Sequence, residues 1–148
     1  MQLISEIMTR DVMTVSPQEN IQRAAQLMDE LNVGAIPVCD GQRLVGMLTD
    51  RDITVRAVAA GAPPDRTPVE QVMSTEVRWC FENQEVNEVM EQMRDVQIRR
   101  IPVMDPHTKI MSGIVSLGDL ATKHSAEVDH TLERISTPSE PDRPQLNS

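Results

Sequence analysis

The 148 residues combine 39% hydrophobic with 25% charged side chains, a balance typical of a soluble globular protein with one domain or two small units. A net charge of −9 argues against general nucleic-acid binding, because that function needs a basic face to replace the counterions on phosphate. We find no run of 18 apolar residues and no leader-like segment, so we expect no membrane association and a cytoplasmic location. The two cysteines, Cys39 and Cys80, stand in unrelated contexts and are predicted to be free thiols.

The chain contains an internal repeat. At a displacement of 65 residues Met8 falls on Met73, and the Ile-Pro-Val segment 36–38 falls on the identical segment 101–103. After two extra residues the displacement becomes 67 and three further pairs align: Gly46 with Gly113, Thr49 with Ser116, and Asp52 with Asp119. The repeat divides the chain into five segments: a lead-in helix at 1–7, a first repeat at 8–61, a linker and lead-in helix at 62–72, a second repeat at 73–125, and a partly disordered tail at 126–148.

The first copy begins with an extended piece at 12–15, which is followed by a helix. Ser16 as N-cap, Pro17 at the first helical position and Glu19 three residues after the cap predict where that helix begins. Helical spacing predicts its buried face: Ile21, Ala24, Ala25, Met28 and Leu31. Two strands are expected next, at 35–40 and 44–49 with a turn at Asp40-Gly41, and then a second helix that ends near Gly61.

The second copy repeats this order. A capping box at 67–70 is expected to start its lead-in helix, and residues 77–81 are expected to be extended. Helical spacing predicts the buried face of the next helix: Val86, Val89, Met90, Met93 and Val96. Each copy therefore has the order β-α-β-β-α. One copy alone would be marginally stable, so we expect an α+β fold in which two copies pack their sheets with pseudo-twofold symmetry.

Both copies place a hydroxyl, and three residues later a carboxylate, where a strand meets a helix. In one interpretation Thr49 and Asp52, like Ser116 and Asp119, form a capping box that satisfies free helix amides. In the other, the helix start and the hydroxyl bind a phosphate while the acid accepts two ribose hydroxyls. The two interpretations are compatible, and recurrence does not separate them because a duplicated cap would also recur.

The segments 46–53 (GMLTDRDI) and 113–120 (GIVSLGDL) resemble the G-h-x-[T/S]-x-x-D-h signature of CBS domains. The segments 34–38 and 99–103 resemble the second-strand motif of that family, and the tandem order resembles a Bateman module. The resemblance covers residues 3–125 and is greatest to small stand-alone bacterial CBS pairs of the hypoxic response protein type. It implies a regulatory module without catalysis that binds an adenosine-containing ligand (AMP, ADP, ATP, S-adenosylmethionine or NAD) and transmits occupancy to a partner protein.

The resemblance also implies which residues contact the ligand: the acid holds ribose, the hydroxyl lies near phosphate, and apolar strand residues enclose adenine. Each site would draw on both copies. One site would combine Met47, Thr49 and Asp52 with Val77, Arg78, Ile98, Arg99 and Arg100. The other would combine Ile114, Ser116 and Asp119 with Val12, Met13, Val33, Gly34 and Ala35. Since Arg51 and three more arginines belong to the first set alone, we expect a di- or triphosphate there, and a less charged ligand or none at the second.

Other features carry weaker expectations. Trp79 and Phe81 share a face of an extended segment, so Trp79 either stacks on adenine or packs in the core or a dimer interface. We expect a homodimer, with Met28, Met90 and Met93 at the interface unless the core absorbs them. Scattered histidines and the lack of a catalytic pattern predict no metal, no obligatory cofactor and no enzyme activity. The competing hypothesis is a stress-associated interaction protein that binds no nucleotide.

Overall fold

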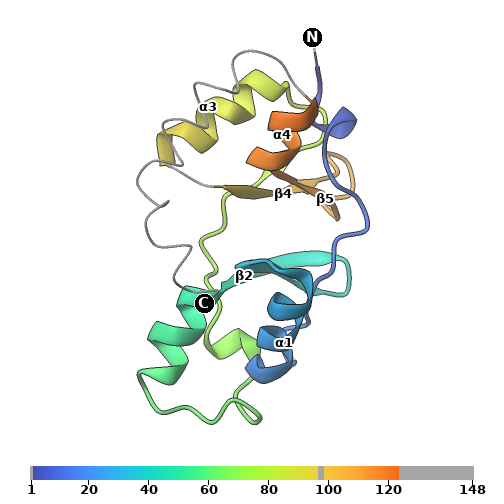
Figure 1. The fold of residues 1–148 in the computed structure, drawn as a ribbon. Helices are drawn as coiled ribbons and strands as arrows, with labels where there is room; N and C mark the ends of the chain where they lie inside the picture. The colour runs from blue at the N-terminus through green and yellow to red at the C-terminus, as the bar shows by residue number, and fades with distance from the viewer. Residues whose placement is uncertain (1, 97–98, 124–148) are drawn as a thin grey trace. The chain divides into compact units, whose positions relative to one another are not determined.

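The computed structural model describes residues 2–96 and 99–123, which belong to two compact units (Figure 1). The first unit is Val12–Arg78, and the second joins the residues up to Asp11 with those from Trp79 onward. Each unit therefore contains one repeat together with the lead-in segment that precedes the other repeat. The expected tail at 126–148 lies outside the described residues. Within the described residues, no helix is long and apolar enough to cross a membrane.

The first unit packs its helices against a two-stranded antiparallel sheet. The sheet runs from Ala35 opposite Thr49 to Asp40 opposite Arg43, and Gly41 occupies the turn with a φ of 65°. The two predicted strands are confirmed, whereas the extended piece expected at 12–15 contributes only a single bridge to β1. The elements of this unit are α1 (Ile21–Leu31), β1 (Ala35–Asp40), β2 (Arg43–Thr49), α2 (Asp50–Asp52), the π-helix η2 (Ile53–Val58) and the 3-10 helix η3 (Val69–Gln71).

Helix α1 begins four residues later than its sequence predicts. Its N-cap is Asn20, whose side chain accepts a hydrogen bond of 2.8 Å from the backbone N–H of Arg23. The predicted cap at Ser16 is wrong because the residues that follow it pair with the lead-in segment of the second repeat. The backbone N–H of Val69 donates to the carbonyl of Glu19 at 2.7 Å, and neighbouring residues add further bonds to the same segment. Tertiary pairing therefore keeps this stretch out of the helix.

Two further expectations for this unit are corrected. Thr67 does not cap a helix, because its hydroxyl donates to the carbonyl of Pro63 at 2.7 Å and η3 begins without a side-chain cap. On α1, Ala25 and Leu31 are exposed while Leu27 is buried, so the buried face is rotated from the predicted one. The core of the first unit consists of Val15, Ile21, Ala24, Leu27, Met28, Ile36, Val38, Leu48, Ala57, Val69 and Val72.

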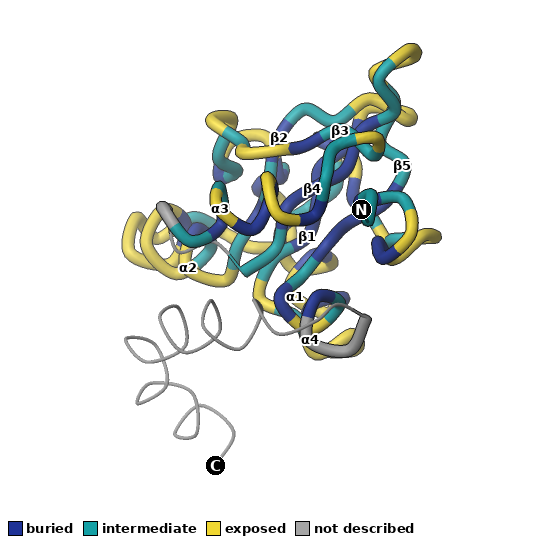
Figure 2. Tube along the Cα trace, turned by 90° about the horizontal axis from the view of Figure 1, so that it is seen from above, coloured by how far each residue is buried: buried dark blue, intermediate teal, exposed yellow. Residues whose placement is uncertain are grey.

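The second unit has a three-stranded sheet in the order β3-β4-β5, in which β3 is parallel and β5 antiparallel to β4. Figure 1 shows α3 and α4 on the same side of β4 and β5. Figure 2 shows that β4 of this unit and β1 of the first unit are among the most deeply buried stretches. The elements are η1 (Ile4–Glu6), β3 (Cys80–Phe81), α3 (Val86–Val96), β4 (Arg100–Met104), β5 (Met111–Ser116) and α4 (Leu117–Lys123).

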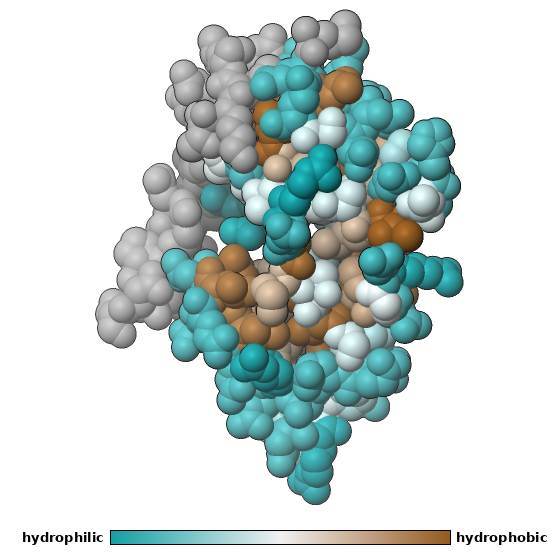
Figure 3. All heavy atoms as spheres, turned by 90° about the vertical axis from the view of Figure 1, so that its right-hand side faces the viewer, coloured by the Kyte–Doolittle hydropathy of each residue, from teal (hydrophilic) through white to brown (hydrophobic). Residues whose placement is uncertain are grey.

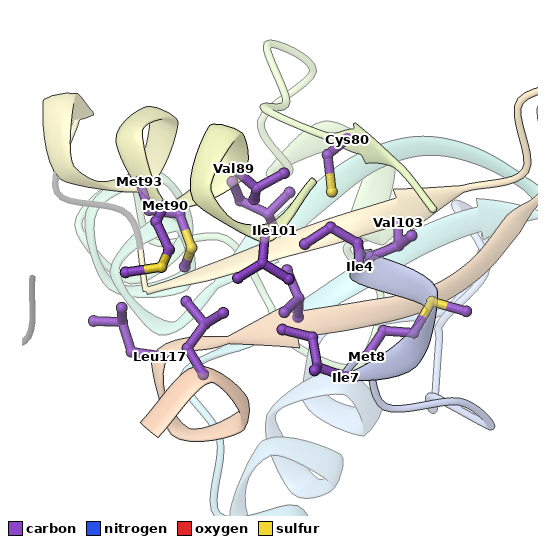
Figure 4. Close-up of a cluster of buried hydrophobic side chains, with 13 residues drawn as sticks. Ile4, Ile7, Met8, Cys80, Val89, Met90, Met93, Ile101, Val103 and Leu117 are labelled. Atoms are coloured by element: carbon purple, nitrogen blue, oxygen red, sulfur yellow. The ribbon is translucent and has the colours of Figure 1, made fainter. Parts of the chain in front are cut away.

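The core of the second unit is filled from η1, α3, α4 and the sheet (Figure 4). The predicted face of α3 is confirmed for Val86, Val89, Met90 and Met93, and the side chain of Val96 lies outside the described residues. The core absorbs the three methionines considered for a dimer interface, since Met28 of the first unit is buried as well. Methionine therefore serves here as the filler of a core that holds few aromatic rings.

Candidate functional site

The hydroxyl and carboxylate of the first repeat bond reciprocally where β2 meets α2. The side chain of Thr49 accepts from the backbone N–H of Asp52 at 2.9 Å, and Asp52 Oδ2 accepts from the backbone N–H of Thr49 at 3.0 Å. The capping-box interpretation is therefore confirmed at this junction. Asp52 is nevertheless unusual for a cap residue, because it is only 8% exposed and is one of two buried polar residues among those described.

Two residues that were absent from the predicted site complete the surroundings of this carboxylate. The hydroxyl of Ser74 donates to Oδ1 and Oδ2 of Asp52 at 3.3 and 3.4 Å. Ser74 is held there by β2, because its backbone N–H and C=O exchange bonds of 2.9 Å with Met47. Arg56 approaches from η2, with Nε 3.8 Å from Asp52 Oδ1. The buried charge is therefore paired and hydrogen-bonded, as burial of an acid requires.

The second unit repeats this arrangement. Asp119 Oδ2 accepts from the backbone N–H of Ser116 at 3.0 Å, and the Ser116 side chain accepts from the backbone N–H of Asp119 at 3.1 Å. The hydroxyl of Thr9 donates to Asp119 Oδ1 at 3.0 Å, and its backbone exchanges bonds of 2.8 and 2.9 Å with Ile114. Thr9 therefore corresponds to Ser74. The displacement of 65 residues already aligns the two, so the repeat contained the signal that would have found them.

The glycine that opens each signature is explained by this pairing. A Cβ on Gly46 would lie 2.7 Å from Met73 Sδ and 2.8 Å from the carbonyl oxygen of Ser74. A Cβ on Gly113 would lie 2.6 Å from the carbonyl oxygen of Thr9. Only glycine therefore lets the backbone of Ser74 or Thr9 approach the strand closely enough to place the hydroxyl on the acid.

Asp50 is the first residue of α2 and follows β2 directly. Its backbone N–H donates to the carbonyl of Gly34 at 2.9 Å, and its Oδ1 accepts from the backbone N–H of Arg51 at 2.8 Å. A Cβ on Gly34 would lie 3.2 Å from Asp50 Oδ2, so the lack of a side chain at residue 34 leaves room for this acid. Arg51 itself is exposed at the junction.

The remaining predicted site residues fall in separate units. The first unit holds Met47, Val77, Arg78, Val12, Met13, Val33, Gly34 and Ala35; the second holds Ile114, Arg99 and Arg100; Ile98 lies outside the described residues. Met13 and Arg78 are exposed, whereas Arg99 and Arg100 are half-buried at the start of β4. The structure therefore assembles the hydroxyl and acid of each site within one unit, and sites shared between the copies remain a prediction.

The thiols of Cys39 and Cys80 are buried and form no disulfide, so neither is an exposed nucleophile. Burial raises the pKa of Cys39, and burial together with the nearby charge of Glu88 raises the pKa of Cys80 to about 12.

Trp79 is 44% exposed and meets Phe81 edge-on, with ring centroids 4.8 Å apart, so the prediction that it packs in the core is wrong. Figure 3 shows hydrophobic residues among hydrophilic ones on one face of the molecule.

The two small sheets, the mixed helices and the duplicated hydroxyl–acid junction define an α+β tandem-repeat protein. The model of the CBS domain matches residues 4–58 and 69–125, so the chain belongs to the CBS domain family and carries a tandem pair. CBS pairs are generally regulatory ligand-binding modules without catalysis, although some form part of an enzyme chain.

Known proteins agree with this assignment. The chain is 47% identical to the CBS domain-containing protein YhcV of Bacillus subtilis, over 82% of this chain and 84% of YhcV. The crystal structure of Hypoxic Response Protein I with two coordinated zinc ions has a TM-score of 0.76 at 34% identity, covering 84% of this chain and 100% of that one. The CBS domain pair of MJ0100, in complex with 5′-methylthioadenosine and S-adenosyl-L-methionine, has a TM-score of 0.69 at 26% identity, covering 82% and 94%. Among the described residues of the present chain, no group of three or more His, Cys, Asp or Glu is placed to hold a metal.

Proposed function

We propose that this protein is a regulatory module that binds adenosine-containing ligands and transmits occupancy to a partner protein. The observation that carries the proposal is the duplicated acid, Asp52 in one unit and Asp119 in the other. Each carboxylate accepts from the backbone N–H of its cap residue and from a hydroxyl just after a lead-in segment. The structural likeness to the MJ0100 pair, which was solved with two adenosine compounds, supports the same ligand class. AMP, ADP and ATP are the first candidates, followed by S-adenosylmethionine and NAD.

The bonding at the junction leaves room for a ligand. The Thr49 oxygen accepts from an amide, and its hydroxyl proton remains available to donate to a phosphate oxygen. A carboxylate offers about four lone-pair sites, so Asp52 can accept ribose hydroxyls beside its bonds to Thr49 and Ser74. We assign phosphate to the hydroxyl of each junction and ribose to the acid. The other residues named from the family resemblance keep their assignment as adenine or phosphate contacts.

A thermal-shift panel tests the ligand class. A compound that binds only the folded state raises the melting temperature by mass action, with about 2.7 kcal/mol of stabilisation at 100 times its Kd. We expect AMP, ADP, ATP, NAD or S-adenosylmethionine at millimolar concentration to raise it, and guanosine compounds to have little effect. The alternative function, a stress-associated interaction protein without nucleotide binding, predicts no shift with any adenosine compound. The existing partners of Asp52 are compatible with both functions, since a capped and paired acid also has a structural role.

The two sites are proposed to differ in charge preference. Arg51 is exposed at the first junction, where the second has Leu117, which is buried, and Gly118. We therefore expect Asp52→Asn to abolish binding of ADP or ATP in calorimetric titration, and Asp119→Asn to remove a weaker site for less charged compounds, if that site binds at all. Asp65→Asn, at an exposed position of the linker, is the matched control. Equal losses of ATP binding from Asp52→Asn and Asp119→Asn would contradict the asymmetry.

We further propose a cytoplasmic homodimer. Buried thiols that form no disulfide suit a reducing compartment, although burial alone would protect them as well. The core absorbs the three methionines first considered, so the interface must use other residues, among which the exposed hydrophobic side chains are Met13, Leu31, Val55, Val58 and Trp79. Sedimentation equilibrium with and without ATP tests the assembly, and a monomer at all concentrations would refute it.

A further inference from the structure

Arg56 connects the buried acid of the first unit to the segment after η3. Its Nη1 donates to the carbonyl oxygens of Val72 and Met73 at 3.4 and 3.1 Å, while its Nε lies 3.8 Å from Asp52 Oδ1. The next residue, Ser74, donates its hydroxyl to the same carboxylate. Two adjacent segments, one in η2 and one at residues 72–74, therefore hold the acid and each other.

Arg56 lies in the π-helix η2. In η2 and just after it, the backbone N–H of Ala59 donates to the carbonyl of Thr54, and that of Ala62 to the carbonyl of Ala57, a spacing of five residues instead of four. The guanidinium then spans two carbonyls and the carboxylate at once, because its five donors form a planar fork. A lysine ammonium carries its three donors on one nitrogen and lacks the separate Nε and Nη1 positions of the guanidinium.

We propose that Arg56 is a positioning residue that orients the Asp52 carboxylate toward ribose hydroxyls, and so determines a preference for ribonucleotides over deoxyribonucleotides. This inference rests on the proposed function, because it concerns how Asp52 meets the ligand. A hydrogen bond to a carboxylate weakens steeply when its angle departs from the preferred direction. A small rotation of the Asp52 carboxylate would therefore weaken its hydrogen bonds to the ribose hydroxyls.

A purely structural role predicts a different outcome. The Arg56 side chain is 54% exposed and its Nε–Oδ1 separation exceeds hydrogen-bond length, so its contribution to folding stability is small. If Arg56 only supported the fold, its loss would weaken the binding of ribo- and deoxyribonucleotides by the same factor. If it positions the acid, its loss weakens ribonucleotide binding selectively. The ratio of the two affinities separates these roles.

The test is calorimetric titration with AMP and 2′-deoxy-AMP in an Asp119→Asn background, so that only the first site reports. We expect the Asp119→Asn protein, which is the parent of the Arg56 variants, to bind AMP about tenfold more tightly than 2′-deoxy-AMP. A factor of this size corresponds to the loss of one charge-assisted hydrogen bond. Arg56→Met should lower that ratio to about twofold, with Arg56→Lys between the two. Arg66→Met, at an exposed arginine of the same unit that pairs with its neighbour Asp65, should keep the parental ratio.

The outcomes separate the two proposals. If the parent binds AMP and Arg56→Met keeps the parental ratio, the positioning role is overturned while the proposed function stands. If neither the parent nor the unmutated protein binds an adenosine compound, both are overturned. If Arg56→Met does not fold, Arg56→Lys alone decides, and a ratio equal to that of the parent overturns the role.

Discussion

Replacement of Gly113 by alanine should separate the lead-in segment from β5 of the second unit. The added Cβ would lie 2.6 Å from the carbonyl oxygen of Thr9 and 3.1 Å from Met8 Sδ, and a backbone oxygen cannot move aside as a flexible side chain can. That same oxygen accepts from the backbone N–H of Ile114 at 2.9 Å. Overpacking costs about 1–3 kcal/mol and a weakened hydrogen bond about 1 kcal/mol, so the expected loss of stability is about 2–4 kcal/mol.

Urea denaturation, followed by circular dichroism, measures this loss as a lower midpoint at an unchanged slope. Gly118→Ala is the matched control, because its Cβ would meet only Ser116 Oγ at 3.4 Å, an ordinary contact, within α4. Alanine is also favoured over glycine in a helix, so this control should match or slightly exceed the parent in stability. A Gly113→Ala protein within about 0.5 kcal/mol of the parent would refute the close approach as the reason for the signature glycine.

Three further predictions concern core packing, the Ser74 hydroxyl and the Cys80 thiol. Met90→Ala in the core should cost about 2–5 kcal/mol in urea denaturation, whereas Met13→Ala at an exposed position should change stability by less than about 0.5 kcal/mol. Ser74→Ala should cost about 0.5–1.5 kcal/mol by the same measurement, because it removes one donor from a buried acid, and an unchanged midpoint would contradict that role. Since the pKa of Cys80 is raised to about 12 in the folded chain, the unfolded chain loses this proton first, from about pH 8.5. Folding stability should therefore be unaffected by this thiol below pH 8 and should fall from about pH 9 toward 12, less steeply in Cys80→Ala, and the native thiol should resist alkylation at pH 8.

Much of the local structure could be predicted because it depends on residues close together in the chain. Two short apolar runs joined by the turn at Asp40-Gly41 located β1 and β2, and the hydroxyl–acid spacing located the capping boxes. The start of α1 could not be predicted, because Ser16 is as good a local cap as Asn20. Its neighbours are instead drawn into hydrogen bonds with residues 67–70, a choice that local propensity does not contain.

The candidate site likewise contains residues that the sequence predicted and residues that only the structure revealed. Thr49 and Asp52 were identified from a single stretch of sequence, and the repeat supplied Ser116 and Asp119. Ser74 was overlooked although the repeat aligns it with Thr9, since nothing local connects a hydroxyl 22 residues away to the acid. Arg56, Ser74 and Thr9 enter only when the chain has folded.

The sequence by itself determined the duplication and the family, because their motifs recur along the chain. It also determined the β1–β2 and β4–β5 pairs and the reciprocal cap at each strand–helix junction, because these depend on spacings of a few residues. Tertiary structure alone decided that each lead-in segment packs with the repeat it does not precede. That exchange brings a hydroxyl donor onto each carboxylate, and in the first unit it brings the carbonyls of residues 72 and 73 within reach of Arg56. Burial supplies the physical reason: an acid removed from water must find partners, and in this fold distant segments of the chain provide them.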